Sequence, residues 1–470
     1  MASIWETNGG IPVGYEATDT EGERPPLVNP LRYKDDRHLV LIGPNGSGKT
    51  KRLLLPALHD LTGWTEIVVD PKGDLCAMTR AHREAAGNRV IILNPFNVLG
   101  LGSTGFNPIA ALELTEDFPD DALELAEAVI KAEGKDPHWG QAAQELVAAI
   151  IMFVRLSLPL GSFADVRKLL SMDFKGYISM VKNPEFQYEG VTMEGIGPLA
   201  ERTGWEEMWN KAARYGDITP ENREMLGVIS TALTQTRWLD SRPVKADLNK
   251  DPIDFSTLKQ QPTTVYLILP ARRLTTHSTW LRLMIASMVQ KLMKDTKRSK
   301  VPVLFMLDEY FALAEGDGFP VVKRNMAMFR GFGIKLWTVW QDLAQAKELY
   351  GDGFETFLGN AGVVQIFAPQ DATTSEYFSR MSGQKTRHPK TKGEQRSPNP
   401  LAPGGTQRSE NISIGAMPLP MLFPQDIRNM EDGFSLIFTH KAKGPVRAYV
   451  PYPSDLPHLR PLCDLDPSAS

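Results

Sequence analysis

The residues with the clearest chemistry are GPNGSGKT at positions 43–50, which have the spacing of a glycine-rich phosphate-binding loop. Glycines let successive backbone amides turn towards phosphate oxygens, and a following helix adds the positive potential of its N-terminus. Lys49 is expected to reach the β- and γ-phosphates, and the Thr50 hydroxyl to bind magnesium. A glycine turn without chemistry is disfavoured, because an apolar strand precedes the segment and a helical run follows it. The predicted nucleotide-binding residues are Gly43, Pro44, Asn45, Gly46, Ser47, Gly48, Lys49, Thr50 and Lys51.

A phosphate-binding loop needs a second group that holds the metal ion and activates water, and VLFMLDEY supplies two carboxylates after an apolar run. At the carboxyl end of a core strand, Asp308 is expected to bind magnesium through water and Glu309 to act as the catalytic base. Solvated carboxylates at a strand end are the alternative. The presence of GPNGSGKT in the same chain favours the catalytic interpretation. With Lys49, these residues predict hydrolysis of ATP with Mg2+ as the metal.

Two further polar residues belong to one predicted strand and its flanking loops. Gln341 directly follows IKLWTVW, where an amide could contact the γ-phosphate or the attacking water. Arg330 precedes that strand and could act as an arginine finger in the site of a neighbouring subunit. From the pattern alone, a helix-capping glutamine and a surface arginine are equally good interpretations.

The elements that must position these residues follow an α/β pattern. Short apolar strands alternate with helical segments, which is typical of parallel βαβ units. Helical periodicity replaces the strands between about residues 117 and 239, and strands then resume. The fold predicted is a P-loop nucleotide-binding domain with a mostly parallel sheet and an inserted all-α domain. The predicted strands are 38–43, 66–70, 88–93, 264–270, 301–307, 334–340 and 363–368.

Five segments are predicted along the chain. They are an N-terminal extension (1–36), the first part of the nucleotide-binding domain (37–116), the inserted all-α domain (117–240), the second part of the nucleotide-binding domain (241–455) and a C-terminal tail (456–470). The tail is rich in proline, so we expect it to be loosely packed. The last two strands, FSLIFT and VRAYV, are expected to form an antiparallel edge of the sheet.

Residues 384–410 are rich in Pro, Gly, Lys and Arg and predict a mobile surface loop. A flexible basic loop could contact a phosphate backbone, and a plain solvated loop is the alternative. The basic residues concerned are Lys385, Arg387, Lys390, Lys392 and Arg396.

The bulk composition sets wide limits. The chain has 470 residues, 42% of them hydrophobic, and a net charge of -4, which excludes a protein that is strongly basic throughout. Two cysteines far apart indicate neither a disulfide scaffold nor secretion. No window of about 18 apolar residues occurs, so no membrane span is expected in this chain. These features favour a cytoplasmic protein.

Several motifs together resemble the coupling proteins of type IV secretion and conjugation, the TraG-type ATPases. They occur in the family's order and span most of residues 38–450. DPKGDL and the segment around Trp139 are not general features of P-loop proteins, which makes the resemblance specific. The motifs are GPNGSGKT, VVDPKGDL, DPHWGQAAQELVAAI, MLDEYFAL, FRGFGIKLWTVWQD with ELYG after it, and MPLPMLFPQDIRNM.

This resemblance implies a RecA-like nucleotide domain and a hexameric ring with a central channel for DNA. It also implies that Arg330 is the arginine finger, that Gln341 is the sensor, and that the helical insertion selects cargo such as a relaxase. Typical members begin with transmembrane helices, whereas this chain begins MASIWETNGG. Either the anchor was removed from this sequence or it is naturally absent, and a peripheral position at the inner membrane would depend on components of the type IV secretion channel.

The function expected is an ATP-hydrolysing motor that recruits relaxase-bound DNA and drives its transfer. One alternative is an ATP-switched adaptor that recruits protein cargo, and another is a hexameric DNA translocase or helicase unrelated to secretion. Asp70, Lys72 and Asp74 could couple the nucleotide state to a subunit interface or simply end a strand. Trp139, at a helix start, is expected to be a packing anchor.

Overall fold

The protein is described from a computed structural model. The description covers residues 5–6, 9–17, 25–132, 137–296, 299–314, 318–387, 390–398, 406–414 and 417–467. Asp136, the first residue of the DPHWG motif, lies outside this range.

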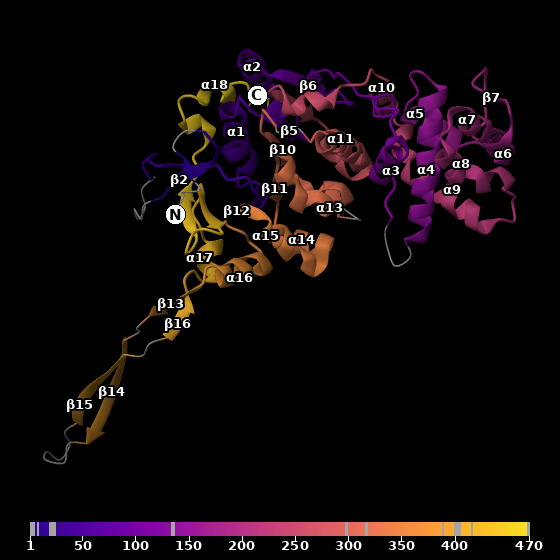
Figure 1. Cartoon of the computed structure of the whole chain (residues 1–470). Helices are drawn as coiled ribbons and strands as arrows, with labels where there is room; N and C mark the ends of the chain where they lie inside the picture. The colour runs from indigo at the N-terminus through magenta and orange to yellow at the C-terminus, as the bar shows by residue number, and fades with distance from the viewer. Residues whose placement is uncertain are drawn as a thin grey trace.

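A twelve-stranded sheet forms the centre of the molecule (Figure 1). Seven neighbouring strands of this sheet are parallel, which confirms the predicted α/β fold with a mostly parallel sheet. In spatial order they are β12 (Ala361–Ile366), β4 (His38–Ile42), β11 (Ile334–Trp340), β10 (Val303–Leu307), β5 (Thr65–Val69), β9 (Thr263–Leu267) and β6 (Arg89–Leu93).

Helices cover both faces of these parallel strands (Figure 1), so the strands are apolar on both sides. Successive side chains of a strand point to opposite faces. In β4, Leu39 and Leu41 pack in one core with helix α1 (Leu55–Asp60), while Val40 and Ile42 pack in the other core. The helices on the two faces are α1 and α2 (Asp74–Ala85) on one, and α11 (Leu274–Lys294) and α13 (Pro320–Phe329) on the other.

The N-terminal residues extend the sheet, which corrects the prediction that the last two strands form its edge. β17 (Phe434–Thr439) pairs antiparallel with β12, and β18 (Val446–Tyr449) pairs with β17. Beyond β18 lie three more antiparallel strands, β2 (Ile11–Glu16), β3 (Pro30–Tyr33) and β1 (Trp5–Glu6). Ile11 and Val13 are fully buried, so residues from this segment contribute to the core.

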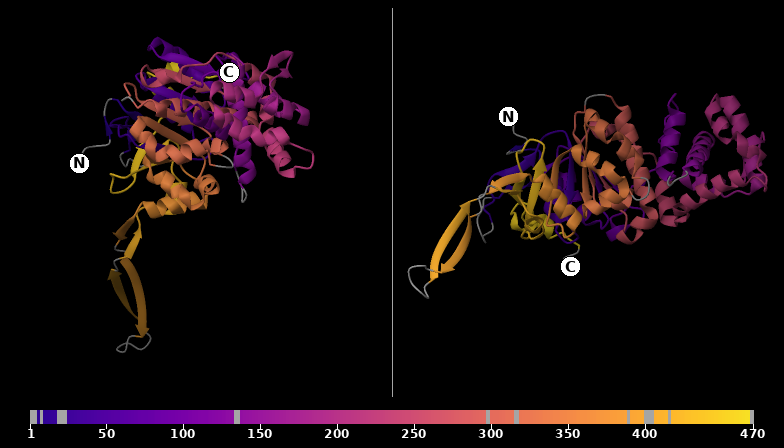
Figure 2. Two further views of the ribbon diagram at one scale, coloured as in Figure 1. Left: turned by 45° about the vertical axis from the view of Figure 1, so that its right-hand side comes forward. Right: turned by 90° about the horizontal axis from the view of Figure 1, so that it is seen from below.

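A largely helical region lies between β6 and β9 and stands to one side of the sheet (Figures 1 and 2). Helices dominate this region as predicted, but it is not all-α, because β7 (Phe186–Tyr188) and β8 (Val191–Met193) form a short β-hairpin within it. Trp139 is partly buried and packs against the core, as predicted. The helices are α3 (Phe118–Val129), α4 (His138–Ser157), α5 (Phe163–Leu170), α6 (Phe174–Lys182), α7 (Ile196–Thr203), α8 (Glu206–Ala212), α9 (Arg223–Gln235) and α10 (Arg242–Leu248).

Helix α3 joins this region to the nucleotide-binding sheet by packing against α11. The Gln290 amide donates hydrogen bonds to Glu124 Oε2 at 2.8 Å and to Asp121 Oδ1 at 3.1 Å. Lys294 forms an ion pair with Asp121. The helical region and the nucleotide-binding sheet are therefore connected by hydrogen bonds and an ion pair as well as by apolar packing.

A two-stranded arm projects from the body where the sequence predicted a loop without strands (Figure 1). It branches off between α16 (Ala372–Met381) and α17 (Pro424–Arg428). At its base, β13 (Gln384–Arg387) pairs with β16 (Met417–Pro420), and further out β14 (Lys390–Pro398) pairs with β15 (Thr406–Ile414). The structure does not describe the side chains of residues 387–417.

The C-terminal tail packs against the body, which corrects the expectation of loose packing. Leu456, Leu459 and Leu462 are buried in the core that contains α1. A short helix, α18 (Arg460–Cys463), lies in this segment. Among the described residues, no helix combines the length and the apolar character that crossing a bilayer requires.

Candidate nucleotide-binding site

The loop GPNGSGKT connects the end of β4 to a helical turn at Thr50–Leu54 that continues into α1. Gly46 and Gly48 have φ angles of 82° and 78°, values that favour glycine. A Cβ at Gly48 would lie 2.9 Å from Arg52 Nε, so this position also needs the space that glycine leaves. Lys49 Nζ turns back over the loop and donates hydrogen bonds to the carbonyl oxygens of Gly43 and Pro44, the latter at 2.9 Å.

The predicted acidic pair lies at the same edge of the sheet as this loop. Thr50 Oγ1 donates a hydrogen bond of 2.9 Å to Asp308 Oδ2, although the two residues are 258 positions apart in sequence. The contact forms because β4 and β10 are parallel strands flanking β11, so their carboxyl ends open onto a shared edge. A hydroxyl and two carboxylates thus converge where a hard divalent cation such as Mg2+ could be bound by oxygen atoms.

Burial governs the charge state of this site. Burial, and after it the charge of the adjacent Glu309, raise the pKa of Asp308 to about 6, while the hydrogen bond from Thr50 opposes the shift. Burial also lowers the pKa of Lys49, against the attraction of Asp308 and Glu309. A buried carboxylate with a raised pKa gains stability when a cation replaces its proton, so the residues present fit a Mg2+ ion.

Glu309 is held beside Gln341 at the ends of adjacent strands. Its φ angle of 52° places it in the left-handed region, an uncommon conformation for a residue other than glycine and one that is frequent at functional sites. Gln341 Nε2 lies 3.4 Å from Glu309 Oε2, within hydrogen-bonding distance. Behind them, the rings of Tyr310 and Trp340 pack with centroids 4.8 Å apart and fix the two strand ends together.

Arg330 lies away from the other predicted site residues of its own chain. It begins a 3-10 turn, Arg330–Phe332, just before β11, whereas Gln341 follows β11. Seven residues of extended strand separate the two ends by about 20 Å. The Arg330 side chain is 55% exposed, and its Nε donates a hydrogen bond of 2.6 Å to Asp36 Oδ2. Arg330 is thus placed on the surface, where another molecule can reach it.

A cavity of about 510 Å³ contains the loop and the acidic pair. Tyr452, Ala271 and Leu274 line it as well, and none of these was predicted as a site residue. Tyr452 follows β18 near the end of the chain, and no local motif marks it as a ligand-binding residue. The other lining residues are Asn45, Gly46, Gly48, Lys49, Thr50, Lys51, Asp70, Pro71, Lys72, Asp74, Asp308 and Glu309.

Asp70 has a structural role at this edge. Its Oδ1 accepts a hydrogen bond from the backbone amide of Gly73 and its Oδ2 accepts one from that of Cys76, both at 2.9 Å. Burial and the neighbouring Asp74 raise the pKa of Asp70. These contacts favour the strand-end interpretation of Asp70, while Lys72 remains exposed at the wall of the cavity.

A second polar cluster, which no sequence motif indicates, lies on α1 and the C-terminal tail. His59, Asp60 and His458 each offer a potential metal ligand, with the ligand atoms within 4.8 Å of one another. Asp60 is already engaged, because His59 Nδ1 lies 2.8 Å from its Oδ1 and Arg32 forms an ion pair with its Oδ2. The guanidinium next to the carboxylate disfavours an added cation, so these contacts stabilise the surface without a metal.

The fold and this edge of the sheet define a P-loop protein of the RecA-like class with one inserted helical domain. Residues 18–449 match the family model described as "Type IV secretory system Conjugative DNA transfer". The chain belongs to this family.

Curated relatives agree with this assignment at low sequence identity. Conjugal transfer protein TraG of Escherichia coli is 24% identical over 390 residues, which cover 76% of this chain and 56% of that protein. Protein VirD4 of Rhizobium rhizogenes is 24% identical over 433 residues, covering 89% of this chain and 59% of that protein. The chain therefore spans a little more than half the length of these relatives.

Solved structures with the same fold include two of coupling protein TrwB. The unbound TrwBdeltaN70 structure has a TM-score of 0.58 at 14% identity and covers 89% of this chain and 85% of that one. The structure of TrwB in complex with ADP and Mg2+ has a TM-score of 0.59 at 13% identity, with coverage of 90% and 87%. At this identity the likeness concerns the fold.

Proposed function

We propose that this protein is an ATP-hydrolysing coupling protein that recruits relaxase-bound DNA and drives its transfer through a type IV secretion channel. The observation that carries the proposal is the 2.9 Å contact between Thr50 of the phosphate-binding loop and Asp308 of the acidic pair. Family membership and the ADP and Mg2+ bound by TrwB support nucleotide and metal as the ligands.

Each site residue has a defined task in this proposal. The loop amides and Lys49 bind the phosphates, and Thr50 and Asp308 hold the metal position. When bound, Mg2+ would neutralise phosphate charge and orient the triphosphate. Glu309 accepts a proton from the attacking water, and the Gln341 amide orients Glu309 through their contact at 3.4 Å. Release of the γ-phosphate changes what Gln341 contacts, which would pass the nucleotide state on to β11.

Assembly of several subunits into a ring would complete the nucleotide-binding site. The exposed Arg330 is the group that a neighbouring subunit would insert as an arginine finger, because it cannot reach the cavity of its own chain. A hexameric ring would then place DNA in its channel, while the helical insertion would contact the relaxase or another cargo protein. We infer a position at the cytoplasmic face of the inner membrane, held there by components of the secretion channel.

The rate of ATP hydrolysis, measured against DNA and protein concentration, tests this function. Single- or double-stranded DNA should raise the rate of the wild-type protein, and Lys49→Ala should abolish it by removing the phosphate contact. A rate that responds to a cargo protein but not to DNA would replace the motor with an ATP-switched adaptor. DNA translocation without relaxase binding would instead indicate a translocase or helicase unrelated to secretion.

A further inference from the structure

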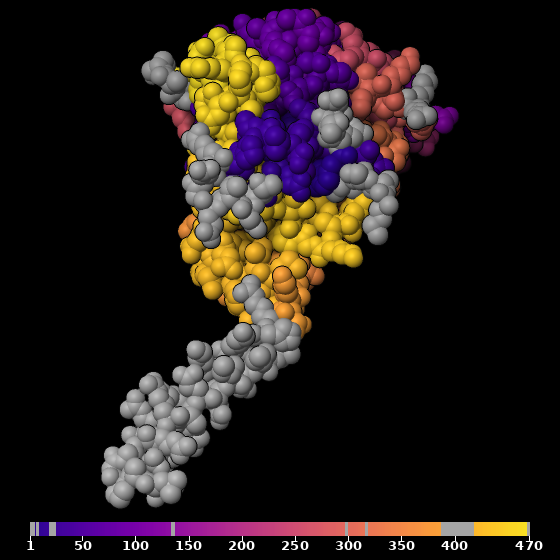
Figure 3. Space-filling model, turned by 90° about the vertical axis from the view of Figure 1, so that its left-hand side faces the viewer, coloured from indigo at the N-terminus to yellow at the C-terminus, as the bar shows by residue number. Residues whose placement is uncertain are grey.

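The C-terminal segment is bonded to the two residues that follow the phosphate-binding loop. Lys51 forms an ion pair with Asp466, close to the end of the described chain. Arg52 is buried, donates a hydrogen bond of 2.9 Å to the Val450 carbonyl oxygen and forms an ion pair with Asp432. Figure 3 shows the corresponding yellow surface lying against the indigo surface of the N-terminal residues. The C-terminal part of the chain, from Asp432 to Asp466, is therefore fastened directly to the residues after the phosphate-binding loop.

Tyr452 lies just after β18, and its aromatic ring is where the C-terminal part of the chain reaches the cavity. The Arg52 guanidinium is 3.6 Å from the centre of this ring, a cation–π contact that holds one side of it. The Tyr452 residue is nevertheless 39% exposed and lines the cavity with Asn45, Gly46 and Lys51. A ring that is fixed on one side and open on another can cover a planar ligand at little entropic cost.

The position of Tyr452 relative to the acidic pair sets which part of a nucleotide it would meet. Thr50 and Arg52 are two residues apart in a helical turn, so their side chains point to roughly opposite sides of it. Thr50 contacts Asp308 at the end of the site where the γ-phosphate and the metal are expected, whereas Arg52 contacts Tyr452. A nucleotide whose phosphates follow the loop would direct its base away from Asp308 and towards Tyr452.

We propose that Tyr452, supported by Arg52, is the stacking platform for the base of the bound nucleotide. This inference rests on the proposed function, because it assumes that the loop holds a triphosphate. Stacking on a flat ring tolerates different bases, since every base has a π-face. The site should accordingly tolerate different bases, with ATP and GTP bound with similar affinity.

Calorimetric titration of the full chain with two ligands tests the platform. The ligands are ATP and inorganic tripolyphosphate, each with Mg2+, and the proteins are wild type, Tyr452→Ala and Tyr452→Phe. Stacking contributes about 1–3 kcal/mol per base, so Tyr452→Ala should weaken ATP binding about 5- to 150-fold. Its affinity for tripolyphosphate should stay unchanged, and Tyr452→Phe, which keeps the ring, should bind both ligands as the wild type does.

The outcomes separate the platform from the phosphate site. If Tyr452→Ala loses affinity for both ligands equally, or for neither, the platform is disproved. If the wild type binds ATP no more tightly than tripolyphosphate, the base makes no favourable contact, and the platform fails even if the alanine variant does not fold. In either case the proposed function would stand if the wild type binds tripolyphosphate and Lys49→Ala abolishes that binding. Wild-type protein that binds neither ATP nor tripolyphosphate would overturn both the platform and the proposed function.

Discussion

Asp308 and Glu309 are adjacent in the chain but lie in different environments. Asp308 is 8% exposed and accepts hydrogen bonds from Thr50 and from the backbone amide of Glu309. Glu309 is only partly buried and has Gln341 as a neighbour. A buried carboxylate suits a metal position and a more accessible one suits proton transfer from water, so the two environments match the two proposed roles.

The raised pKa of Asp308 predicts a pH dependence of metal binding. Because its pKa is about 6 in the folded protein, Asp308 takes up a proton as the pH falls through 6 and then competes poorly for Mg2+. The affinity for ATP in the presence of Mg2+ should therefore decrease below about pH 6, whereas binding of ATP in EDTA should change much less. Isothermal titration across this range measures both.

Asp308→Asn is the matched control for this effect, since it keeps the shape of the side chain and removes the titrating group. The variant should bind Mg2+–ATP weakly at every pH and lose the inflection near 6. An unchanged inflection in this variant would assign the pH dependence to another group.

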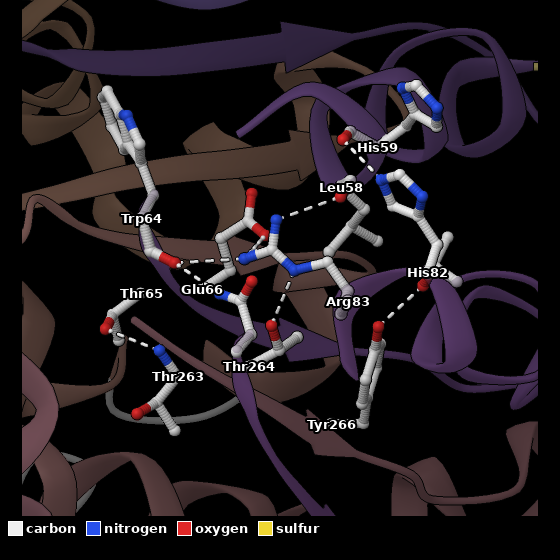
Figure 4. A network of polar contacts seen from close by, with 12 residues as sticks. Leu58, His59, Trp64, Thr65, Glu66, His82, Arg83, Thr263, Thr264 and Tyr266 are labelled. Atoms are coloured by element: carbon white, nitrogen blue, oxygen red, sulfur yellow. Dashed lines mark hydrogen bonds and ion pairs between the residues drawn. The ribbon is translucent and has the colours of Figure 1, made fainter. Parts of the chain in front are cut away.

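At the scale of elements, a buried ion pair connects the helix after β5 to the sheet (Figure 4). Arg83 on α2 is fully buried and forms an ion pair of 2.9 Å with Glu66 on β5. Its Nε donates to Thr264 Oγ1 at 2.8 Å, and its other nitrogens donate to the carbonyl oxygens of Leu58 and Trp64 at 3.0 Å. One guanidinium thus joins α1, α2, β5 and β9 at the amino ends of the two strands, away from the nucleotide edge.

Removing this guanidinium should destabilise the fold. Arg83→Met leaves Glu66 buried without a partner, and breaking such a pair costs about 3–5 kcal/mol. Chemical denaturation should show this loss in the free energy of unfolding. Arg80→Met, an exposed arginine on the same helix, should change stability by less than about 0.5 kcal/mol. Equal effects of the two substitutions would contradict the structural role of Arg83.

At the scale of the whole molecule, the residues that we propose for catalysis are divided between the two edges of the parallel sheet. The loop, the acidic pair and Gln341 share one edge, while Arg330 precedes the opposite end of β11. A single chain therefore holds an incomplete set if Arg330 is needed for hydrolysis. The proposed ring supplies the missing group from the next subunit.

Arg330→Ala should consequently reduce ATP hydrolysis only in the assembled protein. An arginine finger contributes about a thousandfold or more to turnover, and the wild-type rate per subunit should rise with protein concentration as rings form. The variant should bind ATP normally and show no such rise. A monomer that hydrolyses ATP rapidly and loses activity on this substitution would disprove action between subunits.

The sequence predicted those parts of the molecule that depend on local spacing. GPNGSGKT and the acidic pair after an apolar strand are local patterns, and the parallel sheet brings them together as expected. The contact between Arg52 and Tyr452 joins residues 400 positions apart, as their numbers show, and no local pattern indicates it. The strand Ile11–Glu16 begins by alternating buried with more exposed residues. A period of two is the signal of a half-buried strand, and the sequence prediction overlooked it here.

The arm was missed for a different physical reason. Its outer strands pair with each other in a two-stranded ladder separate from the main sheet, and the composition of the segment, rich in Pro, Gly, Lys and Arg, resembles that of a loop. The tail was missed because its prolines suggested a loose segment, whereas three leucines at spacing i, i+3 and i+6 anchor it to the core.

The most direct test of the central claim compares binding and turnover of Mg2+–ATP by the wild type and Glu309→Gln. We expect the variant to bind Mg2+–ATP about as tightly as the wild type, because the loop, Thr50 and Asp308 are intact. Its rate of phosphate release, measured in the presence of DNA, should fall by about a hundredfold to ten-thousandfold through loss of the base. Phosphate release at the wild-type rate would contradict the assignment of this edge of the sheet as the catalytic site.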